Sequence, residues 1–79
     1  MTSQDYINWA NEYRQEAEVV EHRIQKTKMK RKAKIGNIER MKLEKDLSML
    51  FEQKMECLCI AKKLEETARI IKEREGAVG

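Results

Sequence analysis

The chain has 79 residues, of which 39% are charged and 41% hydrophobic, and its formal net charge is +3. A chain this short forms at most one small domain with a marginal core. It has no proline and three glycines, two of them within the last four residues. Lys, Glu, Arg, Met, Gln, Leu and Ala dominate its middle, which is typical of long helices or coiled coils and not of a disordered chain.

The first residues predict the start of a helix. Thr2 and Asp5 have the spacing of a capping box. The polar, acidic beginning lacks the basic start and apolar run of a signal peptide. The longest apolar stretch, Leu58 to Ala61, is four residues, far too short to span a membrane. We therefore expect a cytoplasmic protein that does not contact a membrane.

Hydrophobic residues then recur at alternating spacings of four and three, which predicts one helix that packs along a narrow seam. The seam positions are Tyr6, Ala10, Tyr13, Ala17, Val20, Ile24 and Thr27. The pattern fails at Arg31 and Lys34. In the break that follows, Gly36 could adopt the left-handed conformation that ends a helix, and Asn37 could cap the next. We predict a helix over about 3–34 and a turn over about 35–37.

A second seam follows the break and predicts a helix over about 38–74, with a frayed tail at 75–79. Its positions are Leu43, Leu47, Leu50, Lys54, Cys57, Ala61, Leu64, Ala68 and Ile71. Folding the chain back about Asn37 places large residues opposite small ones, as a close-packed core requires. Val20 opposite Lys54 is the one poor pair. The predicted fold is therefore all-α, a single antiparallel two-helix hairpin.

Apolar residues also flank both seams, so the hydrophobic surface is wider than one helix pair needs. This surface predicts a second neighbour, either another copy in a dimeric four-helix bundle or a target protein. The residues that we assign to such a protein interface are Trp9, Phe51, Leu58 and Ile60.

The charges are strongly segregated along the chain. Residues 1–21 hold five acids and one base, whereas residues 22–45 hold ten bases and two acids. Six cations fall within residues 26–34 with no acid between them, and their mutual repulsion should cost stability unless something outside the chain offsets it. We name the following residues the basic tip, because a hairpin would place them at its turn end: Lys26, Lys28, Lys30, Arg31, Lys32, Lys34, Arg40 and Lys42.

No arrangement in the sequence assembles a catalytic or metal site, and we expect a protein that is not an enzyme. The only histidine, His22, has no nucleophile placed beside it. Cys57 and Cys59 lack the usual spacing of metal ligands, and residues two apart on a helix cannot form a disulfide. There is no glycine-rich phosphate loop, so we predict no cofactor, no metal and no small-molecule substrate.

Leu43, Leu50, Cys57, Leu64 and Ile71 recur at every seventh residue after a basic block, and in this the chain resembles the basic-region leucine zippers. The resemblance implies a parallel dimer on DNA. The asparagine, paired alanines and arginine of that family's basic region are missing, and Gly36 interrupts the helix. In size and architecture the chain is also similar to the small helical-hairpin regulators of plasmid copy number, which suggests a regulator from a phage or mobile element.

Two functions from different classes remain. In the first, the basic tip contacts the phosphates of DNA or RNA with little sequence readout. In the second, the chain is a protein-binding adaptor or inhibitor, with its apolar face on a partner helix and its tip on an acidic surface.

Overall fold

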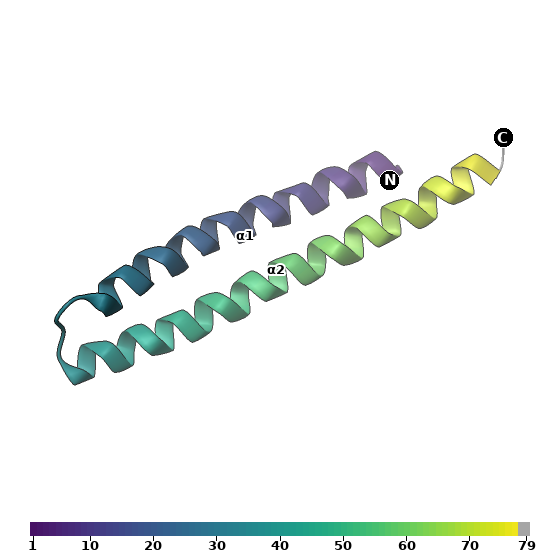
Figure 1. The fold of residues 1–79 in the computed structure, drawn as a ribbon. Helices are drawn as coiled ribbons and strands as arrows, with labels where there is room; N and C mark the ends of the chain where they lie inside the picture. The colour runs from purple at the N-terminus through teal and green to yellow at the C-terminus, as the bar shows by residue number, and fades with distance from the viewer. Residues whose placement is uncertain (78–79) are drawn as a thin grey trace.

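The protein is a two-helix hairpin. The computed structural model describes residues 1–77, which hold the helices α1 (Ser3–Lys32) and α2 (Asn37–Ala77) and no strand. The two helices run side by side in opposite directions and form a rod whose Cα atoms extend over 65 × 15 × 14 Å (Figure 1). The prediction of an all-α helical hairpin is confirmed. The continuous helix that a leucine zipper requires is not what this chain forms.

The capping box that begins α1 is confirmed. The amide of Asp5 donates to Thr2 Oγ1 at 3.4 Å, and the amide of Thr2 donates to Asp5 Oδ2 at 2.9 Å. Each bond satisfies a backbone N–H that has no partner inside the helix. The Thr2 amide and the Thr2 hydroxyl, whose Oγ1 donates to Asp5 Oδ2 at 3.1 Å, hold the pKa of the Asp5 carboxyl below its ordinary value, because they favour the charged form.

The prediction of how α1 ends was wrong. The helix stops at Lys32, Ala33 takes an extended conformation as its C-cap, and Gly36 does not have a positive φ. The amide of Arg40 bonds to the carbonyl of Gly36 at 3.0 Å, so Gly36 occupies the N-cap position of α2 and Asn37 is its first helical residue. Most helical stability in proteins comes from packing of an apolar face, and no apolar seam position follows Thr27 in α1.

At the other end of the chain, α2 continues past its predicted end. It runs through Glu75 and Gly76 to Ala77, whereas the sequence predicted a frayed tail from residue 75. Ser3 Oγ donates to Glu75 Oε2 at 3.5 Å, which links the last turns of α2 to the first turn of α1. Residues 78 and 79 of the predicted tail lie outside the described residues. One glycine near a helix end costs no more than about 1 kcal/mol, which packing can override.

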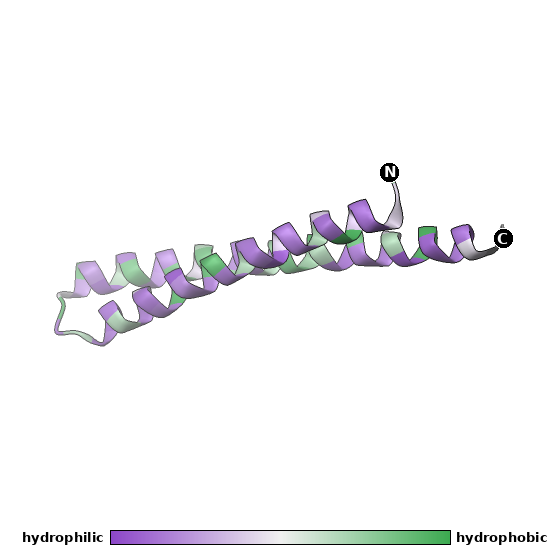
Figure 2. Ribbon diagram, turned by 90° about the horizontal axis from the view of Figure 1, so that it is seen from above, coloured by the Kyte–Doolittle hydropathy of each residue, from purple (hydrophilic) through white to green (hydrophobic). Residues whose placement is uncertain are grey.

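The buried core follows the two predicted seams. Hydrophobic residues recur along both helices between hydrophilic ones (Figure 2). Every predicted seam position is buried or half-buried, and every buried residue is a seam position. The buried residues are Ala10, Ala17, Val20, Ile24, Leu47, Cys57, Ala61 and Ala68. The heptad pattern predicted from the sequence is thereby confirmed.

The core is uneven along the rod. Val20, Ile24 and Leu47 form its one cluster of large buried side chains, and Leu50 packs against them. Towards the termini the buried positions are alanines and Cys57, which bring little apolar area. Tyr6 and Tyr13 are half-buried, and the pairing of large residues with small ones along the seam stays a prediction. The cluster near the turn therefore supplies much of the hydrophobic stabilisation.

Candidate functional site

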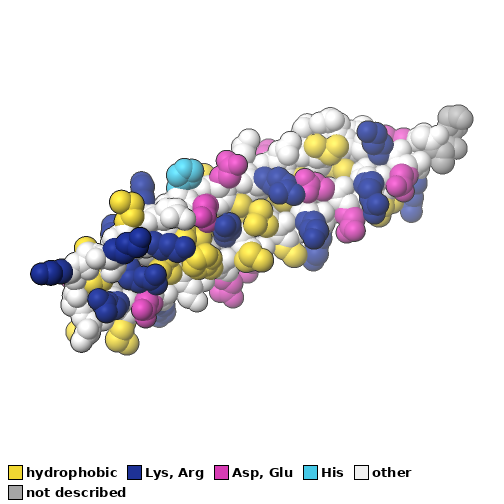
Figure 3. Space-filling view, viewed as in Figure 1, with side chains coloured by type: hydrophobic (Ala, Val, Ile, Leu, Met, Phe, Trp, Pro, Cys, Tyr) yellow, Lys and Arg dark blue, Asp and Glu magenta, His cyan; other side chains and the backbone are white. Residues whose placement is uncertain are grey.

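The basic tip lies at the turn end of the hairpin. It combines the last turns of α1, the connection at residues 33–36 and the first turns of α2. In the space-filling view, Lys and Arg side chains gather around this end of the rod (Figure 3). Every member is exposed except Lys28, which is half-buried. The tip is exposed because the apolar seam of α1 stops at Thr27, so these side chains have no core to enter.

The cations of the tip form no ion pair in the part of the chain that the structure describes. Within residues 1–77 the ion pairs are Arg14–Glu65 and Glu21–Lys54, and both lie nearer to the termini. Glu39 and Glu44 are the two acids of the basic block, and both are exposed. The positive charge of the tip is therefore available to a ligand.

Lys28 differs from the other members of the tip. Its Nζ lies 5.3 Å from the centroid of the Phe51 ring, a cation–π geometry. An exposed contact of this kind contributes about 0.5–1 kcal/mol. Lys28 therefore covers part of Phe51, a residue that the sequence assigned to a protein interface.

The structure brings two members of the tip together from different helices. Lys30 of α1 and Lys42 of α2 line one shallow groove, whose apolar side chains are Ala33, Ile35 and Leu43. No aromatic residue takes part in this groove. Glu39 and Asp46 line the same groove, so its formal charges balance and it offers neither a stacking platform nor a net positive charge of its own.

The four residues predicted for a protein interface do not form one surface. Trp9 and Ile60 line one groove between the helices, whereas Leu58 lines a groove on the opposite side of the seam. Phe51 lies on the side of Leu58, under Lys28. Helical geometry explains this division: Leu58 and Phe51 flank Cys57 on one side and Ile60 on the other. A helical projection of the sequence could have separated them.

We name the side of Trp9 and Ile60 the open face. Two adjoining grooves line it and share Gln53. Near the termini the first groove is acidic, and near the turn the second is basic. The residues of the open face are Trp9, Glu12, Glu16, Arg23, Lys26 and Lys30 from α1, and Asp46, Met49, Gln53, Glu56 and Ile60 from α2. No hydrogen bond or ion pair joins α1 to α2 across this face within residues 1–77.

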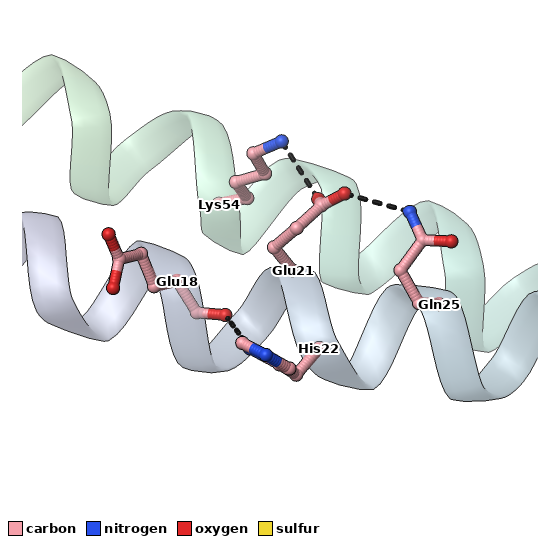
Figure 4. A network of polar contacts seen from close by, with 5 residues as sticks. All are labelled: Glu18, Glu21, His22, Gln25 and Lys54. Atoms are coloured by element: carbon pink, nitrogen blue, oxygen red, sulfur yellow. Dashed lines mark hydrogen bonds and ion pairs between the residues drawn. The ribbon is translucent and has the colours of Figure 1, made fainter.

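We name the opposite side the bridged face, because polar contacts cross it. Arg14 donates from Nε and Nη2 to the two carboxylate oxygens of Glu65, with Nε 3.0 Å from Oε2. Lys54 Nζ donates to Glu21 Oε2 at 2.8 Å, and Gln25 donates to the other oxygen of Glu21 at 2.9 Å (Figure 4). These contacts link the two helices directly. They also explain how Lys54 occupies a half-buried seam position, since its ammonium is bonded to the carboxylate of Glu21.

Neither ion pair was predicted from the sequence. Each joins residues that are far apart in the chain, so the pairing depends on the register of α1 against α2. The signal was present in part, since Arg14 and Glu21 are seven residues apart and stand on one side of their helix.

The two bridging carboxylates are held in their charged forms. Hydrogen bonds from Lys54 and then Gln25 lower the pKa of Glu21, and hydrogen bonds from Arg14 lower the pKa of Glu65. The same pair raises the pKa of Arg14. Because the folded-state pKa lies below the ordinary value of 4.5, this stabilisation is present above that pH and is lost as the pH falls through the folded-state pKa.

We expect the free energy of unfolding to decrease with acidification below pH 4.5, the ordinary pKa of both glutamates. A variant with Glu21→Gln and Glu65→Gln should show a shallower decrease, because its two side chains cannot take up these protons. Urea unfolding at a series of pH values measures both profiles. Glu52→Gln with Glu73→Gln is the control, since both side chains are exposed and neither forms an ion pair in the described chain. Parallel profiles for the wild type and the first variant would contradict the assignment.

The histidine and the two cysteines form no common site in the described residues. His22 Nδ1 lies 2.8 Å from the carbonyl oxygen of Glu18 on its own helix (Figure 4). Cys57 is buried and Cys59 is exposed, as expected for residues on different sides of a helix. Nowhere in residues 1–77 do three metal-ligating side chains gather. Neither helix, over its described length, is apolar enough to cross a membrane.

A comparison of the chain with protein families, with curated proteins and with solved structures finds no match.

Proposed function

We propose that this protein is a small, non-enzymatic regulator that binds DNA or RNA through its basic tip. The observation that supports the proposal is the unneutralised charge of that tip. Seven of its eight cations are exposed, and none forms an ion pair within the described residues. Phosphate would supply the missing counter-charge. Binding would then relieve the repulsion within residues 26–34.

Contact with phosphates gives affinity with little sequence preference. The tip has cations on both helices, so it can reach phosphates on either side of a backbone. Its groove brings Lys30 and Lys42 to one place, although the same groove contains Glu39 and Asp46. The tip has no aromatic side chain on which a base could stack. We therefore expect recognition of backbone charge rather than of bases.

We also propose that two hairpins associate into a four-helix bundle. Exposed apolar side chains on the open face favour it, since Trp9 is 41% exposed, Met49 60% and Ile60 39%. A hairpin with an alanine-rich core buries little apolar surface by itself, so a second layer would add stability. The same exposed residues favour the alternative function, in which this face binds a partner protein and the tip docks on an acidic surface.

The salt dependence of binding separates the two functions. Affinity for a duplex DNA or RNA of mixed sequence should fall steeply as salt rises, with a slope of about −0.9 per phosphate neutralised on duplex DNA. Neutralisation of about five phosphates would give a slope between about −4 and −5 in a double-logarithmic plot. Fluorescence anisotropy with two unrelated sequences measures the slope and the sequence preference together. No retention of either nucleic acid at physiological salt would overturn the proposal and leave the protein-binding function.

A further inference from the structure

We infer that the open face is a self-complementary surface that binds a second copy of this chain with its turn at the opposite end. The inference rests on the proposed self-association and not on nucleic-acid binding. It specifies which face is used and which way the second hairpin runs. Four observations carry it: the charge gradient of the open face, its exposed apolar side chains, its area, and the cross-helix contacts on the opposite face.

The charge of the open face changes sign along the rod. On α1, Glu12 and Glu16 line its groove near the termini, whereas Arg23 and Lys26 line its groove near the turn. The acids and bases are balanced about a point between residues 19 and 20. None of the four is neutralised across the hairpin, because the ion pairs of the described residues lie on the bridged face.

A second hairpin placed on this face with reversed direction matches charge to charge. A twofold axis between residues 19 and 20 brings α1 against α1 of the second copy. Glu16 then lies level with Arg23 of the other copy, and Glu12 lies one residue, about 1.5 Å by helical rise, from the level of Lys26. Each pair occurs twice because of the symmetry. With both turns at one end, the twofold axis would run along the rod and stack α1 on α2 of the second copy. Glu12 and Glu16 would then lie near Glu56, whereas Arg23 and Lys26 would lie near Asp46. The acidic grooves would still meet at one end and the grooves of net positive charge at the other, which costs free energy.

The same axis agrees with α2. Gln53 belongs to both grooves of the open face and lies level with the middle of α1 in the antiparallel hairpin. Across a twofold axis it would meet its own counterpart. A glutamine amide both donates and accepts, so two of them can satisfy each other. On the open face, α2 carries acids on both sides of Gln53 and so has no change of sign. Its central residue, Gln53, can form hydrogen bonds with the same residue of the second copy.

The size of the face suits a dimer. With the axis between residues 19 and 20, the two rods overlap over about 50 Å by helical rise, and a face 15 Å wide then offers about 750 Å², close to the roughly 800 Å² per partner of a standard interface. The second copy would cover the exposed side chains of Trp9, Met49 and Ile60. The ion pairs between the two copies would set their relative orientation. On the opposite face, the Arg14–Glu65 and Glu21–Lys54 pairs and the cation over Phe51 already use the polar and aromatic groups. The bridged face therefore has fewer charged and aromatic side chains that could contact a second copy.

The dimer divides the basic block between two tasks. Lys26 would pair with a glutamate of the second copy, whereas the cations at and beyond the end of α1 would stay free. The two tips would lie at opposite ends of the bundle. From residue 36 to the axis is about 25 Å by helical rise, so the tips would be about 50 Å apart.

Complementary charge reversal tests the inference. Between residues 12 and 26, Glu12→Lys with Glu16→Lys makes the charged side chains of α1 on the open face all basic, and Arg23→Glu with Lys26→Glu makes them all acidic. Each variant alone should raise the dissociation constant of the dimer on the order of a hundredfold at low salt, since like charges then meet. An equimolar mixture of the two should form a heterodimer. Glu18→Lys with Glu66→Lys is the matched control, since it changes the net charge as the first variant does but lies off the open face.

Sedimentation equilibrium measures the dissociation constants, and circular dichroism checks that each variant stays helical. A spin label at Gly36→Cys, in a chain with Cys57→Ala and Cys59→Ala, gives the orientation. No atom lies within 4 Å of a Cβ at Gly36, so the label is accommodated. We expect a distance of about 50 Å between labels, whereas hairpins with both turns at one end would give about 20 Å or less.

Different results would contradict the proposed self-association and the proposed orientation of the two copies. A wild-type chain that stays monomeric at high concentration would overturn the inference together with the proposed self-association. A stable dimer with a short distance between labels would overturn this inference alone. So would reversal variants that dimerise as well as the control, or a mixture that fails to restore association.

Discussion

The Ile24→Ala variant is expected to lose about 2–5 kcal/mol of unfolding free energy, the cost of removing a fully buried large aliphatic side chain. Ile24 is 0% exposed and packs with Val20 and Leu47 in the one cluster of large side chains that this core has. Small domains have a total stability of about 5–15 kcal/mol, so a loss of this size removes much of it. Urea unfolding followed by circular dichroism measures the change.

Ile38→Ala is the matched control, because it makes the same chemical change at a side chain that is 72% exposed near the start of α2. Surface substitutions of this kind change stability by less than about 0.5 kcal/mol. An Ile24→Ala variant as stable as Ile38→Ala would contradict the position of the core. If the chain dimerises, the two variants must be compared at one protein concentration.

Neutralising the basic tip should abolish nucleic-acid binding without unfolding the hairpin. The variant carries glutamine at four exposed positions that take no part in the core or in a described ion pair, namely Arg31, Lys32, Lys34 and Arg40. We expect affinity to fall on the order of a hundredfold or more near physiological salt, for every sequence alike. The salt slope should become shallower by about 0.9 for each phosphate of duplex DNA that the variant no longer neutralises. Lys28 is left in place because it covers Phe51.

The control removes the same number of charges at exposed positions on the distal half of α2, by glutamine at Lys62, Lys63, Arg69 and Lys72. Binding governed by net charge would weaken equally in both variants, and that result would contradict a role for the tip itself. If the ligand is a protein, the tip variant should instead associate more slowly and keep much of its affinity. Trp9→Ala would then do the greater damage, since buried aromatic anchors dominate protein interfaces.

Local pattern in the sequence was enough for the parts of the fold that depend on a single helix. The capping box of Thr2 and Asp5 needs residues three apart, and it forms as predicted. The two seams follow from a period near 3.5, and every position that they name is at least half-buried. The exposure of the basic tip follows as well, because charged residues past the last seam position have no apolar partner. Each of these features depends on residues that are close together in the chain, and such residues can be compared directly in the sequence.

The ends of the helices were less predictable, for a physical reason. Glycine is the residue that most often ends a helix in the left-handed conformation, and Gly36 was predicted to do so. Instead α1 stops at Lys32, and Gly36 is the N-cap of α2. No residue of α1 after Lys28 is buried or half-buried, so packing does not extend the helix as far as Gly36. Gly76 was likewise predicted to follow the end of a helix, but it lies inside α2.

Only the tertiary structure decided which charges are neutralised and which remain free. Arg14 finds Glu65 and Glu21 finds Lys54 because of the register of one helix on the other, and no local rule supplies that register. The same packing separates Phe51 and Leu58 from Trp9 and Ile60 by placing the seam between them. The composition and order of the residues determined a helical hairpin with a basic end. The docking of α1 on α2 then determined that one face is joined by ion pairs while the other keeps its charges unpaired, because side chains far apart in the chain meet only once the helices pack.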